Sequence, residues 1–259
     1  MNLLVTNDDG IASPFLRELV TALLAAGHAV HVAAPKTEQS WVGAAKSRSR
    51  PVHAAAVDLG FGCPTWSIDG TPSDCVNIAL DHLVPATTSI DAVVSGINVG
   101  FNASLGFIIA SGTIAGAWEG ALHGLPAIAF SQALTEPAYE ALKAAHDLPD
   151  PDLLVTLRHS AAHAARLTPA LVAATAPRLF VVHNVNFPLP CTAATTVVRA
   201  VPAQVVIPRL FTAACINGTH SLRFHPGEDI SPDEPLTDRA ALVAGHISHT
   251  VLDYTRLGR

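Results

Sequence analysis

Charged residues are scarce in this sequence, and neither sign forms a long run. Only 14% of the residues are charged, and the net charge is -6 with histidine neutral. Without a basic stripe to neutralise a phosphate backbone, a nucleic-acid duplex is not an expected partner. The one locally basic segment, residues 46–50, is either a solvated loop or a substrate contact.

Long apolar runs and cysteine motifs are missing as well. No apolar stretch reaches the ~18 residues that a membrane-spanning helix needs. The first residues carry no basic region and no cleavage site, so we expect no signal peptide, no membrane partner and a cytoplasmic location. The four cysteines (Cys63, Cys75, Cys191 and Cys215) include no Cys-x-x-Cys pair, which argues against a zinc ribbon or a disulfide framework and predicts buried or idle thiols.

A short apolar segment near the start of the chain runs into two neighbouring carboxylates, Asp8 and Asp9, and then into Gly10. The pattern predicts a buried strand that ends in a sharp turn. Two adjacent carboxylates repel each other unless a positive charge lies between them, and a divalent cation is the simplest remedy. The alternative is a plain turn, since Asn-Asp-Asp-Gly is also good turn chemistry.

Apolar segments of strand and helix character alternate along most of the chain, as expected for parallel strands joined by helices. We therefore predict an α/β fold: a Rossmann-like, mostly parallel sheet flanked by helices, formed by residues 1–190 with a hairpin excursion near 41–68. Residues 191–259 are expected to form a C-terminal, β-rich extended arm and hairpin used in oligomerisation. The expected strands are 3–6, 28–34, 52–57, 65–68, 90–95, 126–131 and 179–186, the last closing the core, and the expected helices are 13–26, 70–83, 111–121, 153–167 and 237–243.

Polar residues follow three of the expected strands. Asp8 and Asp9 follow the first, Ser40 follows the second, and Asn98 with Asn102 follows a later one. In an open parallel sheet the carboxyl ends of the strands share one edge, where ligands bind. Two carboxylates, a hydroxyl and an amide oxygen make an all-oxygen set for Mg²⁺, Mn²⁺ or Ca²⁺, with water and substrate oxygens completing the shell.

The helix expected at 111–121 begins with small hydroxyl residues. Its first backbone N–H groups suit a phosphate, although an ordinary N-cap explains Ser111 and Thr113 equally well. A cation with open positions beside such a helix start indicates phosphate hydrolysis. Asp8 or Asp9 could also orient or deprotonate the attacking water, and the residues alone do not separate these roles.

Six ordered motifs resemble one family. They are Leu-Val-Thr-Asn-Asp-Asp-Gly-Ile (4–11), Ala-Pro-x-x-x-Gln-Ser (34–40), Gly-Thr-Pro-x-Asp-Cys-Val (70–76), Ser-Gly-Ile-Asn-x-Gly-x-Asn (95–102), Ser-Gly-Thr-x-x-Gly-Ala-x-Glu-Gly (111–120) and Asn-Val-Asn-x-Pro (184–188). The pattern closely resembles the SurE family of metal-dependent 5'/3'-nucleotidases, also called survival protein E or stationary-phase acid phosphatases. The likeness covers most of residues 1–132 and reappears weakly near 237–248.

The resemblance implies hydrolysis of nucleoside 5'- and 3'-monophosphates to nucleoside and phosphate, with one divalent cation per subunit. It also implies a C-terminal arm swapped between the subunits of a homodimer or homotetramer. By the resemblance, the metal ligands are Asp8, Asp9, Ser40 and Asn98, with Asp8 and Asp9 catalytic, and the phosphate contacts are Asn102, Ser111, Gly112 and Thr113.

The chain departs from the family pattern close to these positions. Trp41 stands where the family usually has glycine or another small residue, and its ring could stack on a base or simply pack within the loop. The stretch 107–110 is more apolar than is usual before Ser-Gly-Thr, and His249 stands where the family tends toward Ser-x-Thr-Pro-Leu. These changes leave open a specialised phosphatase for a modified nucleotide or another metabolite phosphate.

Two further readings compete with hydrolysis. A nucleotide-dependent transferase on the same fold is disfavoured because no Gly-x-Gly-x-x-Gly follows the first strand. A non-catalytic phosphate-binding protein is disfavoured by the complete ligand set. No histidine is assigned a role, including His123, His183 and His246 near the motifs, because none falls within a strand-end motif.

Overall fold

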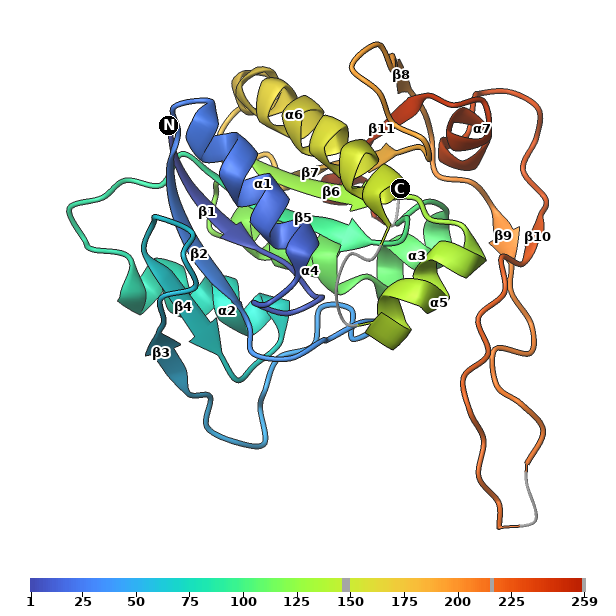
Figure 1. Ribbon diagram of the computed structural model, residues 1–259, viewed down its shortest axis with the longest axis horizontal. Helices are drawn as coiled ribbons and strands as arrows, with labels where there is room; N and C mark the ends of the chain where they lie inside the picture. The colour runs from blue at the N-terminus through green and yellow to red at the C-terminus, as the bar shows by residue number, and fades with distance from the viewer. Residues whose placement is uncertain (146–149, 215–216, 258–259) are drawn as a thin grey trace.

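The computed structural model describes residues 1–145, 150–214 and 217–257. In this part of the chain nine strands form one sheet, in the order β3-β4-β2-β1-β5-β6-β7-β11-β8 (Figure 1). The strands are β1 (Asn2–Thr6), β2 (Ala29–Pro35), β3 (Ala54–Ala56), β4 (Thr65–Ile68), β5 (Ala92–Val99), β6 (Ala127–Gln132), β7 (Val181–Phe187), β8 (Val197–Arg199) and β11 (Ile247–Asp253).

The middle of the sheet is parallel. Strands β4, β2, β1, β5, β6 and β7 all run in one direction, whereas β3 and β11 pair antiparallel with their neighbours β4 and β7. Strand β6 is buried along its whole length, as expected for a strand covered on both faces. The predicted Rossmann-like, mostly parallel fold is confirmed.

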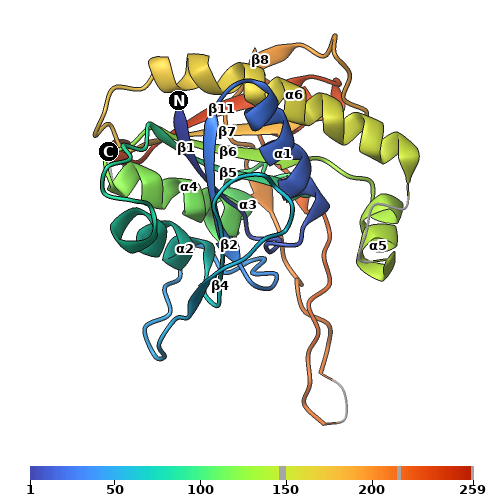
Figure 2. The same ribbon diagram turned by 60° about the vertical axis from the view of Figure 1, so that its left-hand side comes forward.

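Helices cover both faces of the sheet (Figures 1 and 2). On one face α1 (Pro14–Ala25) packs against α6 (Pro151–Ala173), and their apolar side chains join the largest core cluster. On the other face α2 (Pro72–Ile78), extended by a π-helical turn (Ala79–Leu83), packs against α4 (Gly112–Leu122). Helix α1 begins at a Ser-Pro pair and ends before Gly27, whose φ of +80° suits a helix stop.

Three elements differ from the sequence expectations. The prediction that 179–186 is the last strand of the core was wrong. A later strand, β11, pairs with β7 and lies inside the sheet. Residues 96–99 continue β5 beyond the expected end of this strand at residue 95. Two helices were missed, α3 (Leu105–Ala110) and α5 (Glu136–Ala145). The latter is weakly apolar and lies in a polar, proline-containing stretch, where its amphipathic pattern was overlooked.

The C-terminal part of the chain both leaves the body and returns to it. Strand β8, helix α7 (Asp238–Val243), β11 and a short 3-10 turn (Tyr254–Arg256) pack on the body, whereas residues 205–214 and 217–229 project from it (Figures 1 and 2). This projection, which we call the hairpin, begins and ends with the pair β9 (Val205–Val206) and β10 (Glu228–Asp229).

The structure also bears on the cysteines and on possible membrane-spanning helices. Cys63, Cys75 and Cys191 are free thiols, the last two buried, and Cys215 lies outside the described residues. None of the helices in the described ranges is long and apolar enough to cross a membrane.

Candidate functional site

The two neighbouring carboxylates lie where the direction of chain winding reverses. β1 has β2 on one side and β5 on the other, so the carboxyl ends of β1 and β5 flank the switch point of the sheet. Ligands of such sheets bind in the crevice at this place. Asp8 and Asp9 follow β1 directly, and Asn98 lies in the last residues of β5.

Hydrogen bonds tie both carboxylates to other segments of the chain. Asp8 is 3% exposed, and its Oδ1 accepts a hydrogen bond from Thr113 Oγ1 at 2.5 Å. Its backbone oxygen accepts from the N–H of Gln39 at 2.7 Å, which brings in the loop after β2. Asp9 Oδ2 accepts from the N–H of Val99 at 2.9 Å. The ends of three strands and the start of α4 are therefore joined around the pair.

Glycines allow α4 to approach the sheet this closely. They recur every fourth residue, at Gly112, Gly116 and Gly120, on one face of the helix. A Cβ at Gly120 would lie 2.5 Å from Val93 Cβ, and one at Gly112 would lie 2.8 Å from Asp8 Cβ and 2.9 Å from Asp8 Oδ2. The first turn of α4 can meet Asp8 only because this face carries no side chains.

Burial disfavours the charged forms of the Asp8 and Asp9 carboxylates. It raises the pKa of Asp8 to about 6, against the opposing effect of the hydrogen bond from Thr113. It also raises the pKa of Asp9 well above its ordinary value, to which the neighbouring charge of Asp8 adds. Glu38, in the loop after β2, adds a third negative charge. A bound cation would offset all three.

The two neutral oxygen donors predicted from the sequence lie in the loop after β2 and in the last residues of β5. Ser40 is half-buried, and its Oγ donates to Glu38 Oε1 at 2.7 Å. Asn98 is 8% exposed, and its Nδ2 donates to the backbone oxygen of Gly100 at 2.7 Å, which leaves Oδ1 available as a ligand. Hard, oxygen-only donors with two carboxylates fit a divalent cation of the Mg²⁺ or Mn²⁺ type.

The donor set is unusual in having few charged ligands. No group of three or more His, Cys, Asp or Glu side chains that could hold a metal occurs in the described part of the chain. Asp8 and Asp9 provide two such side chains, and Ser40 and Asn98 provide neutral oxygens. A cation held by this set would keep positions open for water and substrate.

The start of α4 serves as both an N-cap and a site wall. Ser111 Oγ accepts a hydrogen bond from the N–H of Ile114 at 3.0 Å, so the capping alternative holds for its hydroxyl. Thr113 instead directs its hydroxyl to Asp8. The positive end of an eleven-residue helix thus faces the carboxylate pair.

Asn102 is held by a group of asparagines and a serine rather than by the carboxylates. Its Nδ2 donates to Ser131 Oγ at 2.9 Å, and its N–H donates to Asn186 Oδ1 at 2.7 Å. Its backbone oxygen accepts from Asn184 Nδ2 at 2.8 Å. Asn184 and Asn186 were recognised as part of a motif, but only the paired strands show that they position the loop after β5.

Three further features near the site were given no role from the sequence, although Glu119 lies within one of the six motifs. One is Glu38, described above. Tyr139 of α5 has a pKa raised by burial and then by the charges of Glu38 and Asp9, which places its ring within electrostatic reach of the pair. The last is the buried carboxylate of Glu119, which pairs with Lys46 and accepts from Asn77 Nδ2 at 2.8 Å. It joins the loop after Ser40 to α4 and α2.

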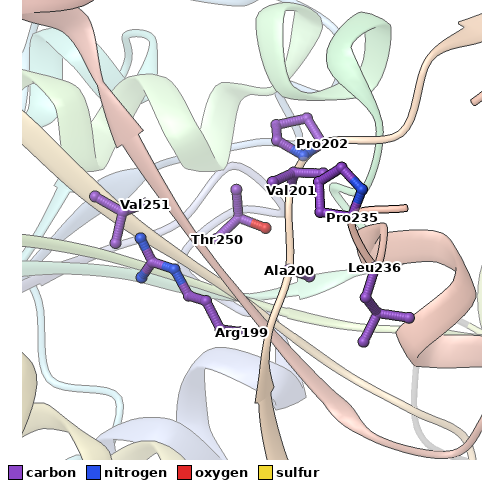
Figure 3. Close-up of a pocket in the computed structure, with 8 residues that line it drawn as sticks. All are labelled: Arg199, Ala200, Val201, Pro202, Pro235, Leu236, Thr250 and Val251. Carbon is purple, nitrogen blue, oxygen red and sulfur yellow. The ribbon is translucent and has the colours of Figure 1, made fainter. Parts of the chain in front are cut away.

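A separate cavity of about 190 Å³ lies away from these residues (Figure 3). Side chains from β8, from β11 and from the segment before α7 line it, and they include Arg199 and Thr250. None of the predicted site residues contributes to it, so it is distinct from the carboxylate site.

Fold and site together define a Rossmann-like α/β protein with a paired-carboxylate, oxygen-lined site at its switch point. The sequence profile described as Survival protein SurE matches residues 3–206. The chain therefore belongs to the SurE family.

Individual relatives agree with this assignment. The 5'-nucleotidase SurE of Solidesulfovibrio magneticus is 38% identical over 98% of this chain and 92% of its own length. That of Gloeobacter violaceus is 44% identical, over 51% of this chain and 50% of its own length. Among solved structures, the SurE protein from Aquifex aeolicus matches with a TM-score of 0.74 at 26% identity, covering 98% of this chain and 93% of that one.

Proposed function

We propose that this protein is a divalent-metal-dependent phosphomonoesterase that hydrolyses nucleoside 5'- and 3'-monophosphates to nucleoside and phosphate. The observation that carries the proposal is the buried pair Asp8–Asp9 at the switch point, with Asp8 held by Thr113 in the first turn of α4. Relatives that align over nearly the whole chain bear the name 5'-nucleotidase SurE, which supports the same activity.

The roles of the side chains follow from their contacts. Asp8 and Asp9 would hold one divalent cation per subunit, Mg²⁺ or Mn²⁺, with Ser40 and Asn98 completing the protein ligands. Once bound, the cation supplies positive charge that polarises the phosphoryl group and makes water a better nucleophile. The hydrogen bonds from Thr113 and from the N–H of Val99 fix one oxygen of each carboxylate, so the pair is oriented before substrate arrives.

The phosphate would lie against the start of α4 and the loop after β5. Backbone N–H groups in the first turn of α4, between Ser111 and Thr113, offer fixed donors and positive potential for the phosphate oxygens. Asn102 would contribute from the opposite side, because its attachment to Asn184 and Asn186 holds the loop in place. The remaining carboxylate oxygens of Asp8 and Asp9 are the groups available to orient the attacking water.

A second candidate is a phosphatase of the same fold with a specialised substrate, either a modified nucleotide or another metabolite phosphate. It is favoured by Trp41, a large exposed aromatic residue directly beside the ligand Ser40. The chemistry and the site residues would be the same, and only the leaving group would differ.

Phosphate release tests the proposal. The native protein is assayed on 5'- and 3'-nucleoside monophosphates and on an aryl phosphate, with Mg²⁺ or Mn²⁺ and with chelator. We expect chelator and Asp8→Asn each to lower release by a factor of about 1,000, because chelator removes the cation and the substitution removes part of the charge that holds it. Asp91→Asn is the matched control, since Asp91 is an exposed carboxylate at the opposite end of the sheet that accepts from the N–H of Asn2.

The results of this assay distinguish the nucleotidase from the specialised phosphatase and from a protein that only binds phosphate. Metal-dependent release confined to one unusual ester would favour the specialised phosphatase. Phosphate binding without turnover under any metal would indicate a binding protein and contradict the proposal. Full activity of Asp8→Asn would show that the reaction occurs elsewhere.

We also propose that the protein assembles as a homodimer or homotetramer through the hairpin. Its apolar side chains Phe211 (59% exposed) and Leu222 (46% exposed) have little cover from the described chain, whereas Phe224 (52% exposed) also contacts Phe107 of α3. Exposed apolar surface of this kind marks a contact with a partner, and a second copy fits the family resemblance. A cytoplasmic location stays a prediction of the sequence.

A further inference from the structure

Trp41 follows Ser40 directly, in a loop that is hydrogen-bonded to the segment before α4. The backbone of its loop returns to the body at Gly43, whose N–H donates to the backbone oxygen of Ala110 at 2.9 Å. Ala110 immediately precedes Ser111, the N-cap of α4. The loop that carries Trp41 therefore runs from Ser40 to the residue before the start of α4, where the phosphate would lie.

The backbone of Trp41 adopts a conformation that favours glycine. Its φ is +64°, in the left-handed region where a Cβ crowds the backbone. The SurE family resemblance places glycine or another small residue at this position, which fits that conformation without strain. A large aromatic ring here is kept at a cost in backbone free energy, and such costs are concentrated at functional positions.

An aromatic cluster holds the ring from one side. Trp41 meets Phe107 of α3 nearly at right angles, with ring centroids 5.6 Å apart and an interplanar angle of 78°. Phe107 meets Phe101 in the same way at 5.7 Å. The guanidinium of Arg239 lies over both phenylalanine rings, 5.2 Å from Phe101 and 5.4 Å from Phe107. Because Phe101 lies between Asn98 and Asn102, the cluster borders both sets of proposed ligands.

Contacts further along the loop fix its backbone. The N–H of Ser47 donates to both carboxylate oxygens of Asp74, at 3.1 and 3.2 Å. Lys46 pairs with Glu119, whose side chain is only 2% exposed. The loop that presents Trp41 is therefore attached to α2 and α4 and does not need substrate to take its shape.

The other two tryptophans of the chain are covered. Trp66 stacks on His31 at an interplanar angle of 6°, and Trp118 lies against Tyr254 with centroids 4.0 Å apart. Both are half-buried, whereas Trp41 is 40% exposed. Only Trp41 combines a fixed loop, an aromatic support and an open surface beside the proposed site.

We propose that Trp41 is a substrate-specificity residue that stacks on a planar heteroaromatic group, such as a nucleobase, of the phosphoester held at Asp8 and Asp9. The inference rests on the proposed function and adds the residue that recognises the base, so that esters whose leaving group carries only a sugar or an alkyl chain would be poorer substrates. Base–aromatic stacking tolerates different bases because every base has a π-face, so several nucleotides would be accepted.

Fluorescence tests stacking without turnover. In the full-length double variant Trp66→Phe/Trp118→Phe, Trp41 is the remaining tryptophan. We expect adenosine to quench its emission saturably, whereas ribose leaves it unchanged. An emission that does not respond to adenosine, at concentrations where adenosine competitively inhibits hydrolysis of adenosine 5'-monophosphate, would overturn the proposal.

Kinetics in the native background provide the second test and do not depend on the double variant. Adenosine 5'-monophosphate and ribose 5-phosphate form a matched substrate pair, since they differ in the base. Trp41→Gly removes the ring while keeping a residue suited to the positive φ, and Trp41→Phe keeps an aromatic ring. We expect Trp41→Gly to lower kcat/KM for the nucleotide about tenfold, mainly through KM, which corresponds to about 1.4 kcal/mol. Ribose 5-phosphate should be unaffected, and Trp41→Phe should restore most of the loss.

The two proposals fail in different ways. If Trp41→Gly lowers hydrolysis of both esters equally, Trp41 acts by positioning Ser40, and the stacking proposal is wrong while the phosphatase stands. If native protein with Mg²⁺ or Mn²⁺ releases phosphate from neither ester, the proposed function itself fails on these substrates. Equal activity of native protein and Trp41→Gly on the nucleotide would also contradict stacking.

Discussion

The switch-point edge and the hairpin are built in opposite ways. At the edge, hydrogen bonds join Asp8 and Asp9 to three separate segments, and the side chains are largely buried. In the hairpin, the pair β9–β10 joins two residues on each side, and the apolar side chains beyond it are exposed. The edge is therefore held by contacts within one chain, whereas apolar side chains of the hairpin have little cover from the described residues.

After the loss expected for Asp8→Asn, the next largest effect comes from disturbing the edge at Gly112. In Gly112→Ala the new Cβ would lie 2.8 Å from Asp8 Cβ, so either α4 or the carboxylate must move. We expect kcat/KM for phosphate release to fall about 100-fold, because a displacement of about 1 Å in a reacting group is enough for such a loss. Circular dichroism should show that the fold persists.

Gly106→Ala is the control for this change. Gly106 is exposed in α3, and its added Cβ would make an ordinary contact of 3.5 Å with Ile207 Cδ1. Its activity should stay native. If Gly112→Ala keeps native activity as well, the close approach of α4 to Asp8 is not needed for the reaction.

A smaller effect is expected from changing the hairpin. Phe211 and Leu222 face each other in an antiparallel bridge and are 59% and 46% exposed. The double variant Phe211→Ser/Leu222→Ser should raise the dissociation constant of the assembly about tenfold or more, because the apolar contact with the partner is lost. Size-exclusion chromatography with light scattering measures the mass over a dilution series.

Val243→Ser is the matched control for the hairpin. Val243 is 90% exposed, but it lies on α7, which packs on the body. We expect this variant to assemble as the native protein does. An unchanged mass for the hairpin variant at every dilution would contradict assembly through this segment.

The smallest expected effect is a pH dependence of folding stability, caused by two histidines where β7 pairs with β11. His183 Nδ1 and His249 Nε2 lie 2.9 Å apart, and burial lowers the pKa of each to about 4. The unfolded chain, with pKa values near 6.5, binds more protons between these limits. Stability from this pair is therefore complete above about pH 6.5 and is lost as the pH falls toward about 4.

A histidine variant measures this contribution. His249→Gln should reduce the fall in Tm between about pH 7 and about pH 4.5 by about 3 °C, while exposed His220→Gln in the hairpin should leave it unchanged. If His249→Gln follows the same pH curve as the native protein, the buried pair does not contribute to acid sensitivity.

The sequence predicted the elements whose signals are local. Apolar runs that end in Asp8 or Asn98, and a helix that begins with Ser111, can be recognised within a few residues. Parallel strands then bring their carboxyl ends to one edge, which predicted the composition of the site. Glycine spacing in α4 was visible too, but its purpose depends on Asp8 lying opposite Gly112.

The missed features depend on distant pairing. Strand β11 is recognisable only beside β7, since its polar residues Ser248, His249 and Thr250 hide a strand pattern. Asn184 and Asn186 gain their role from the loop that they hold. Tyr139 reaches the site because α5 is placed there by the fold, and nothing in its neighbours along the chain indicates that position.

The position of β11 also sets an order for folding during synthesis. Until β11 leaves the ribosome, β7 has an unpaired edge, and the ribosome must first make everything between Phe187 and Ile247, including the whole hairpin. An open edge strand is a site of unwanted pairing between nascent chains. The sheet closes late, so the completed body and the hairpin become available at nearly the same time.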